Sequence, residues 1–315
     1  YVGGASVSNV LIKDNEINGN VNIEVYNSES WDPGTSSYVY GSPSDSIVLA
    51  SNIINSSIGF SVQTYNSTPS INNVIKGNQI YSNSQYIYTS NVDSIIGNRM
   101  SGAENTTGMN VYSGETVVAN NYITIGGIGT SKGIVVSEQA SNSLIVYNSI
   151  NNTGNNSTGS VALEVLGQPT ALTVKNNIFA CTGGGTPVSI PSAQSGHDWD
   201  YNDYYSTAGT VGNYQGTNYL SPSSFGTALG SDANSFELNP YFISDTDLMI
   251  IQRQLNGAGI DAGGIIDDID GELRNLAAPD IGAQEFMIDF GVTQLLQPTL
   301  SCGHTSNETI EVLLR

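Results

Sequence analysis

The acidic run near the C-terminus is the part of the sequence best suited to bind a metal ion. Four carboxylates fall within six positions: Asp267, Asp268, Asp270 and Glu272. This spacing places several hard oxygen ligands on one tight turn, which suits Ca²⁺, although the remaining ligand positions of an EF-hand loop are missing. The alternative is a purely structural turn, in which Gly271 supplies the unusual backbone and Asp270 or Glu272 pairs with Arg274.

Carboxylate pairs that could cleave a polysaccharide are a second candidate for chemistry. Glu104 with Glu115, or Glu138 with Glu164, could meet across neighbouring repeats at the roughly 5–10 Å that glycosidases need. A lyase would need clustered carboxylates for Ca²⁺ and a nearby basic residue, but residues 1–190 hold only 11 carboxylates and 5 basic residues. Nothing in the sequence marks either set. We therefore expect a non-catalytic protein, with a polysaccharide lyase or glycosidase as the alternative.

The abundance of tyrosine suggests contact with sugars. The chain has 17 Tyr against 7 Phe, and a tyrosine on a β surface presents a flat amphipathic face. The candidate glycan-stacking residues are Tyr81, Tyr86, Tyr88, Tyr112 and Tyr122. The alternative is that these rings simply cover an exposed β face. The partner expected from this pattern is a polysaccharide or a cell-surface glycan.

Charge and hydropathy exclude other classes of function. The formal net charge is −20, with only 8 Lys and Arg against 28 Asp and Glu. Nucleic-acid binding needs a basic patch, which so few cations cannot build, and the same net charge would repel a polyanionic substrate. The 38% of hydrophobic residues is enough for a core. No run of about 18 apolar residues occurs, so we expect no transmembrane segment in this region.

The elements that would carry these residues follow from a repeat. Seven asparagines each have an apolar residue three positions before and two positions after: Asn15, Asn52, Asn78, Asn98, Asn121, Asn148 and Asn177. A short run of alternating apolar residues follows each motif. Units of this length cannot bury their own apolar face, so they must stack into a solenoid with one continuous core. The spacing favours a parallel β-helix over a β-sandwich with accidental spacing.

The repeated asparagine has a structural explanation. At a bend between two strands it tolerates the left-handed backbone region, and its amide can bond to backbone groups. Stacked on the same residue of the next coil, it would form a ladder of amides. The first step between asparagines is 37 residues and the later ones are 20 to 29, which predicts an inserted loop at residues 31–44.

Residues 193–286 read as closing coils and a cap, after coils at 1–192. They contain Asp-Trp-Asp-Tyr-Asn-Asp-Tyr-Tyr at 198–205, Asn-Pro-Tyr-Phe at 239–242, Asp-Ile-Asp-Gly-Glu at 268–272 and Ala-Pro-Asp-Ile-Gly-Ala at 278–283. With the asparagine repeat, these motifs resemble the right-handed parallel β-helix repeat proteins, a pectate-lyase-like family, in large surface proteins of Bacteroidetes type. The resemblance covers residues 1–286.

The resemblance implies a fold, a location and a role. It implies an all-β chain: a right-handed parallel β-helix solenoid, a C-terminal cap, and the start of an immunoglobulin-like β-sandwich at 287–315. It also implies a secreted or cell-surface, adhesin-like or spacer module exported by a type 9-like route. Secretion or surface machinery is then a further expected partner. The two chain ends suggest a segment of a larger protein.

Overall fold

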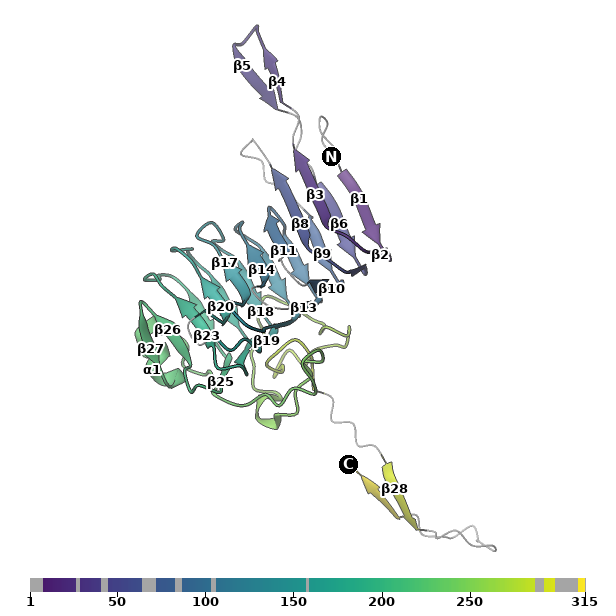
Figure 1. Ribbon diagram of the computed structural model, residues 1–315, viewed down its shortest axis with the longest axis vertical. Coiled ribbons are helices and arrows are strands. Elements are labelled where there is room, and N and C mark those ends of the chain that lie inside the picture. The colour runs from purple at the N-terminus through teal and green to yellow at the C-terminus, as the bar shows by residue number, and fades with distance from the viewer. Residues whose placement is uncertain are drawn as a thin grey trace, which may run out of the picture. The chain divides into compact units, whose positions relative to one another are not determined.

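The computed structural model describes residues 8–26, 29–40, 45–63, 72–82, 87–102, 106–156, 159–286, 292–297 and 311–314. The chain divides into two compact units, residues 1–285 and residues 286–315. In the first unit the chain winds repeatedly through three parallel sheets, which confirms the predicted all-β, parallel β-solenoid fold. Figure 1 shows strands of one sheet, from β8 to β23, stacked side by side.

Each sheet takes one short strand from each coil. Sheet 1 contains β1 (Ser8–Lys13), β6 (Asp45–Ala50), β9 (Val74–Lys76), β12 (Ser94–Ile96), β15 (Val117–Ala119), β18 (Leu144–Val146), β21 (Thr173–Lys175) and β24 (Asp198–Asp200). Sheet 2 contains β2 (Glu16–Ile17), β7 (Ile53–Ile54), β10 (Gln79–Ser82), β13 (Arg99–Gly102), β16 (Tyr122–Ile125), β19 (Ser149–Asn152), β22 (Ile178–Cys181) and β25 (Asp203–Ser206). Every coil therefore adds one strand to each sheet.

Sheet 3 completes each coil and ends in a hairpin. It contains β3 (Val21–Tyr26), β8 (Ile58–Gln63), β11 (Ile87–Ser90), β14 (Thr107–Val111), β17 (Lys132–Val136), β20 (Val161–Val165), β23 (Thr186–Ile190), β26 (Gly212–Tyr214) and β27 (Thr217–Tyr219). Only β27 runs antiparallel to its neighbour.

The core is built from columns of identical positions in successive coils. In sheet 2, for example, Ile80 pairs with Met100, Met100 with Ile123, and Ile123 with Ile150. These are the residues two positions after each repeated asparagine, and Ile123 and Ile150 are fully buried. The regular column explains why the apolar spacing in the sequence is so strict: a shifted residue would point its side chain away from the core.

A hairpin interrupts the first coil. Strands β4 (Glu29–Asp32) and β5 (Ser37–Tyr40) pair in antiparallel fashion and lie in sequence between β3 and β6. This hairpin accounts for most of the long first step between asparagines. It begins two residues before the predicted insertion, and residues 41–44 of that insertion lie outside the described part of the chain.

A short helix packs against the last strands of sheet 3. Helix α1 (Pro222–Leu229) begins after Ser221, whose Oγ accepts a hydrogen bond from the Ser224 amide, and ends at Gly230 with φ 80°. Its Phe225 is fully buried and packs edge-on against Tyr204, with ring centroids 5.7 Å apart. A Cβ on Gly212 would lie 2.7 Å from the Phe225 ring, so only glycine fits beneath it.

The rest of the first unit is irregular. Within residues 236–286 the structure has one helical element, the 3₁₀ turn η1 (Arg253–Leu255), and no strand longer than an isolated β-bridge. In the second unit, β28 (Val292–Gln297) and β29 (Glu311–Leu314) form an antiparallel pair. Among the described residues, no helix has both the length and the apolar character to cross a membrane.

Candidate glycan-binding site

The seven repeated asparagines form a continuous hydrogen-bonded ladder. Each side-chain amide donates to the Oδ1 of the next asparagine at 2.9–3.0 Å, and the backbone N–H of each donates to the same atom. The ladder runs one step further than the sequence indicated, from Asn177 to Asn202. From Asn52 onward, each amide also bonds to a backbone carbonyl of the preceding coil, as Asn121 Nδ2 does to Ile95 O. The ladder therefore fixes the register of sheets 1 and 2 at their shared corner.

The left-handed backbone lies one residue before the ladder, where the sequence interpretation placed it on the asparagine itself. The preceding residues have φ between 54° and 68°: Asp14, Ser51, Gly77, Gly97, Asn120, Tyr147, Asn176 and Tyr201. The bend is thus made by one residue, and the asparagine beside it is free to use its amide. In the early coils this bend residue is small, and from Asn120 onward it is large.

The large bend residues hold residues 254–286, the C-terminal part of the irregular segment 236–286, against the solenoid. Tyr147 donates its hydroxyl hydrogen to Ile260 O at 2.9 Å, and the amide of Asn176 donates to the same carbonyl at 2.6 Å. Asn120 donates to Asp267 O at 2.7 Å. Three consecutive coils therefore anchor this segment, whereas the coils with Ser51, Gly77 and Gly97 offer no such side chain.

Arg274 is the central anchor of the segment. Its guanidinium donates to Asn120 Oδ1 at 2.9 Å and to the Gly282 and Ala283 carbonyls. It also pairs with Glu285 at 3.2 Å and lies 4.1 Å above the Tyr147 ring. The sequence interpretation paired Arg274 with Asp270 or Glu272. The observed partner is Glu285, because the chain turns back between these residues.

The acidic cluster forms a tight turn within the same segment. Asp268 Oδ1 accepts hydrogen bonds from the amides of Asp270 and Glu272, and its Oδ2 accepts one from the amide of Glu285. Gly271 has φ 82°, as a turn of this kind requires. In the described residues, no three His, Cys, Asp or Glu side chains gather to hold a metal ion, Asp267 included. Backbone amides already occupy Asp268, so these contacts account for the motif as a structural turn. The calcium site expected from the sequence is a hypothesis for experiment.

The predicted tyrosines Tyr81 and Tyr122 line a depression on the outer face of sheet 2. Its floor has two rows across β10, β13 and β16: Gln79, Arg99 and Tyr122 in one row, and Tyr81, Ser101 and Thr124 in the other. Thr246 and Met100 complete a lining that encloses about 140 Å³. Pockets for drug-sized ligands usually exceed about 300 Å³, so this space suits one ring of a longer ligand.

The irregular segment makes one edge of this depression. Ala283 N donates to Ser149 Oγ at 3.0 Å and the Tyr122 hydroxyl donates to Gln284 Oε1 at 2.7 Å, so the segment covers sheet 2 from β16 onward. Tyr122 is 3% exposed, whereas Tyr81, two strands earlier, is 47% exposed. The depression lies where the covered part of the face gives way to the open part.

Charged groups beside the floor are largely paired. Arg99 bonds to Asp270 Oδ1 at 2.6 Å and lies 5.3 Å from the centre of the Tyr122 ring. Gln284 donates to the other oxygen of Asp270 at 2.8 Å. Burial, together with the charges of Asp247 and Asp270, raises the pKa of Tyr122, so its phenol is neutral at physiological pH. The floor thus offers hydrogen bonds and an exposed ring, without a free base.

The other predicted tyrosines lie elsewhere. Tyr88 and Tyr112 belong to sheet 3 and its following turn, and their rings tilt together with centroids 5.9 Å apart. They do not share the depression with Tyr81. Tyr86 lies outside the described residues. The structure therefore divides the tyrosines between two faces. Tyr88 borders a hollow of about 220 Å³ on sheet 3 that is also lined by Asn20, Asn22 and Ser57. The sheet 2 depression differs in having a more exposed ring, Tyr81, beside polar side chains from three consecutive strands.

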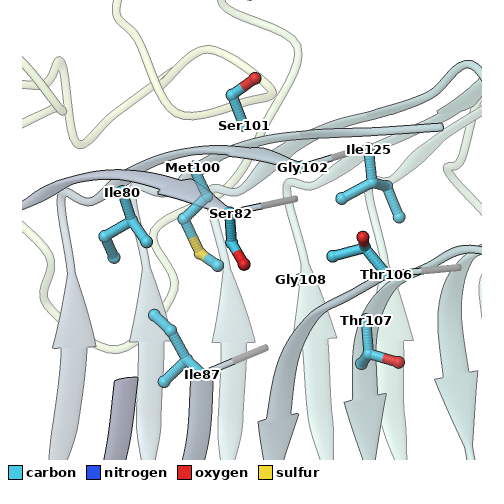
Figure 2. A pocket seen from close by; sticks show the side chains of 10 residues that line it. All are labelled: Ile80, Ser82, Ile87, Met100, Ser101, Gly102, Thr106, Thr107, Gly108 and Ile125. Carbon is cyan, nitrogen blue, oxygen red and sulfur yellow. The ribbon is translucent and has the colours of Figure 1, made fainter. Parts of the chain in front are cut away.

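A smaller hollow lies inside the coils and carries no polar machinery. Figure 2 shows Ile80, Met100 and Ile87 directed into it, while Ser101 points to the opposite side of its strand. Its free volume of about 10 Å³ is at the lower limit for one water molecule. We interpret it as imperfect packing of the core. Ser101, in contrast, faces the depression on the outside of sheet 2.

The described carboxylates among those considered for catalysis lie in different surroundings. Glu164 forms an ion pair with Lys132 and is largely buried. Glu138 lies on the surface beside Gly167, and Glu115 is exposed at a turn. Glu104 lies outside the described residues.

Sequence reasoning missed Gln79, Arg99, Ser101, Thr124 and Thr246. A signal was present for four of them. The positions one and three residues after each ladder asparagine point outward, and Gln79, Arg99, Ser101 and Thr124 occupy such positions after Asn78, Asn98 and Asn121. Thr246 could not be found in this way, because it comes from the irregular segment.

Comparison with known proteins adds no family. No protein-family model, curated protein or solved structure matches this chain significantly. The fold and the depression therefore have to be interpreted from their own geometry.

Proposed function

We propose that this chain is a non-catalytic, rigid module of a secreted or cell-surface protein, and that it binds a glycan in the sheet 2 depression. The observation that carries the proposal is the pairing of an exposed aromatic ring with polar side chains on consecutive strands. Tyr81 offers a stacking face, and Gln79, Ser101 and Thr124 offer hydrogen-bonding groups around it. Such a combination suits a sugar ring, which has an apolar face and polar edges.

The wider architecture fits the same role. We propose that the solenoid is right-handed and of the pectate-lyase-like type found in Bacteroidetes surface proteins. The protein would be exported by a type 9-like route, and the secretion machinery of that route would be a partner. Residues 193–286 would close the coils, which the burial of Phe225 supports. Residues 287–315 would begin an immunoglobulin-like module, which the antiparallel β28–β29 pair supports.

A binding role fits the site better than the alternative, a polysaccharide lyase or glycosidase. A lyase needs a basic group free to take a proton. Arg99 is engaged by Asp270, and the raised pKa of Tyr122 disfavours a phenolate there. A glycosidase needs two carboxyl groups facing one bond. The carboxylates of Asp270 and Asp268 are instead held by Arg99, Gln284 and backbone amides.

A glycan panel tests this proposal. The purified protein is applied to immobilised polysaccharides, and the same preparations are assayed for shortened chains. We expect binding without depolymerisation, and a loss of at least tenfold in affinity for Tyr81→Ala. Tyr112→Ala is the matched control, because Tyr112 is similarly exposed, at 40%, but lies away from the depression. Depolymerisation would support the enzyme alternative, and binding that depends on Tyr112 instead would move the site to sheet 3.

A further inference from the structure

The depression has an unusual balance of charge. Arg99 is its one basic lining residue, and Asp270 neutralises it through a 2.6 Å contact. Asp270 is itself fixed by Gln284, so the Arg99–Asp270 pair is held from both sides. A guanidinium held in this way is a poor partner for a second carboxylate, because the new anion would have to compete with one already in place.

Further negative charge surrounds the pair. Asp247 and Asp268 both act electrostatically on Tyr122 at the edge of the floor. Asp247 is exposed and follows Thr246, which lines the depression. Against Asp247, Asp268 and Asp270 stand two cations, Arg99 in the lining and Arg274 near Asp268. An approaching anion therefore meets a net negative field.

We propose that the depression selects uncharged sugar chains and rejects uronic-acid or sulfated ones. This inference rests on the proposed glycan-binding function and names its ligand class. One neutral pyranose ring lies on Tyr81, and its hydroxyl groups exchange hydrogen bonds with Gln79, Ser101 and Thr124. The neighbouring rings extend over the open face of sheet 2 toward β7, where Ile53 is 41% exposed. The acidic groups beside the floor act as the element that excludes anionic sugars.

Titration calorimetry with two sets of probes tests the selectivity. The neutral probes are hexasaccharides of β-linked glucose, mannose and xylose, and the anionic probe is hexagalacturonate. We expect the wild type to bind at least one neutral probe at least tenfold more tightly than hexagalacturonate. Asp270→Asn removes the charge that compensates Arg99 while keeping the side-chain size. It should raise hexagalacturonate affinity at least fivefold and change neutral affinity less than twofold.

A second variant keeps the selectivity testable if Asp270→Asn does not fold. Asp247→Asn changes an exposed residue outside the turn and should shift selectivity in the same direction, and circular dichroism checks both variants. If the wild type binds hexagalacturonate more tightly than every neutral probe, the charge selection is overturned. If Tyr81→Ala then loses the binding of hexagalacturonate, the depression is still a glycan site. Unchanged selectivity in both folded variants would also overturn it. Failure of the wild type to bind any probe would overturn the proposed function as well.

Discussion

The backbone N–H of Asn202 donates to Ser235 Oγ at 2.8 Å, at the position where every earlier ladder asparagine meets the next one. Ser235 therefore substitutes for the Oδ1 of the asparagine that would belong to a further coil. Its hydroxyl in turn bonds to Asp232, whose other oxygen accepts from the Tyr204 hydroxyl. The ladder thus ends in a small buried network, and no amide at its end is left unsatisfied.

Removing one rung should destabilise the solenoid strongly. Asn121→Ala removes the side-chain amide that donates to Asn148 Oδ1, Ile95 O and Ala119 O. It also removes the Oδ1 that accepts from the backbone and side-chain N–H groups of Asn98. Each buried group left unsatisfied costs about 1–3 kcal/mol, so we expect the free energy of unfolding to fall by about 3 kcal/mol or more. Urea unfolding followed by circular dichroism measures it. Asn155→Ala, at an exposed position, is the control and should change it by less than about 0.5 kcal/mol. Equal losses would refute a structural role for the ladder.

Removing Arg274 should release the irregular segment while leaving the coils folded. The guanidinium holds Asn120, Glu285 and two carbonyls, and breaking a buried ion pair costs about 3–5 kcal/mol. In Arg274→Ala, hydrogen exchange should accelerate in residues 254–286 and stay unchanged in sheet 3. Arg274→Lys should behave similarly, because one ammonium cannot replace the planar fork of donors. Arg253→Ala, at an exposed position, should have no effect. Uniform acceleration along the whole chain would contradict this view of the segment.

The stability of the protein should fall as the pH rises from 6.5 to 8. Burial raises the pKa of Asp203 from 3.8 to about 8, so the folded state holds a proton that the unfolded state has already released. Asp232, with a pKa near 6, and His197, whose pKa is lowered from 6.5, contribute mainly below this window. Asp203→Asn should flatten the pH dependence of the melting temperature, and the exposed Asp245→Asn should preserve it. A wild-type melting temperature that increases across this window would contradict the assignment.

Calcium should leave the folded state unchanged. The oxygens of Asp268 accept backbone amides, and Asp270 bonds to Arg99 and Gln284, so an ion would have to displace contacts already made. We expect the melting temperature to stay the same, within about 1 °C, with excess Ca²⁺ or with a chelator. A rise with Ca²⁺ that Asp268→Asn abolishes would support the calcium site expected from the sequence.

The solenoid could be predicted from the sequence because it is periodic. Each coil repeats an asparagine and two apolar positions, so local spacing determines which residues stack in neighbouring coils. The position of residues 236–286 could not be predicted in this way. Its contacts join residues far apart in the chain, and Arg99 and Asp270, for example, are separated by 171 positions. No local pattern encodes such a pairing.

The candidate site also combines residues that the sequence could predict with features that it could not. Tyr81 and Tyr122 were predicted from their residue type, and Gln79, Arg99, Ser101 and Thr124 follow from the outward positions of the repeat. The burial of Tyr122 and the edge at Thr246 depend on the irregular segment. The sequence could therefore indicate a face with exposed tyrosines, but the place where that face is hollowed required the tertiary structure.

A crystal structure with a bound neutral hexasaccharide tests the central claim most directly. We predict one sugar ring stacked on Tyr81, with hydroxyl groups in hydrogen-bond reach of Gln79, Ser101 and Thr124. A hexasaccharide seated instead on Tyr88 and Tyr112 of sheet 3 would contradict it.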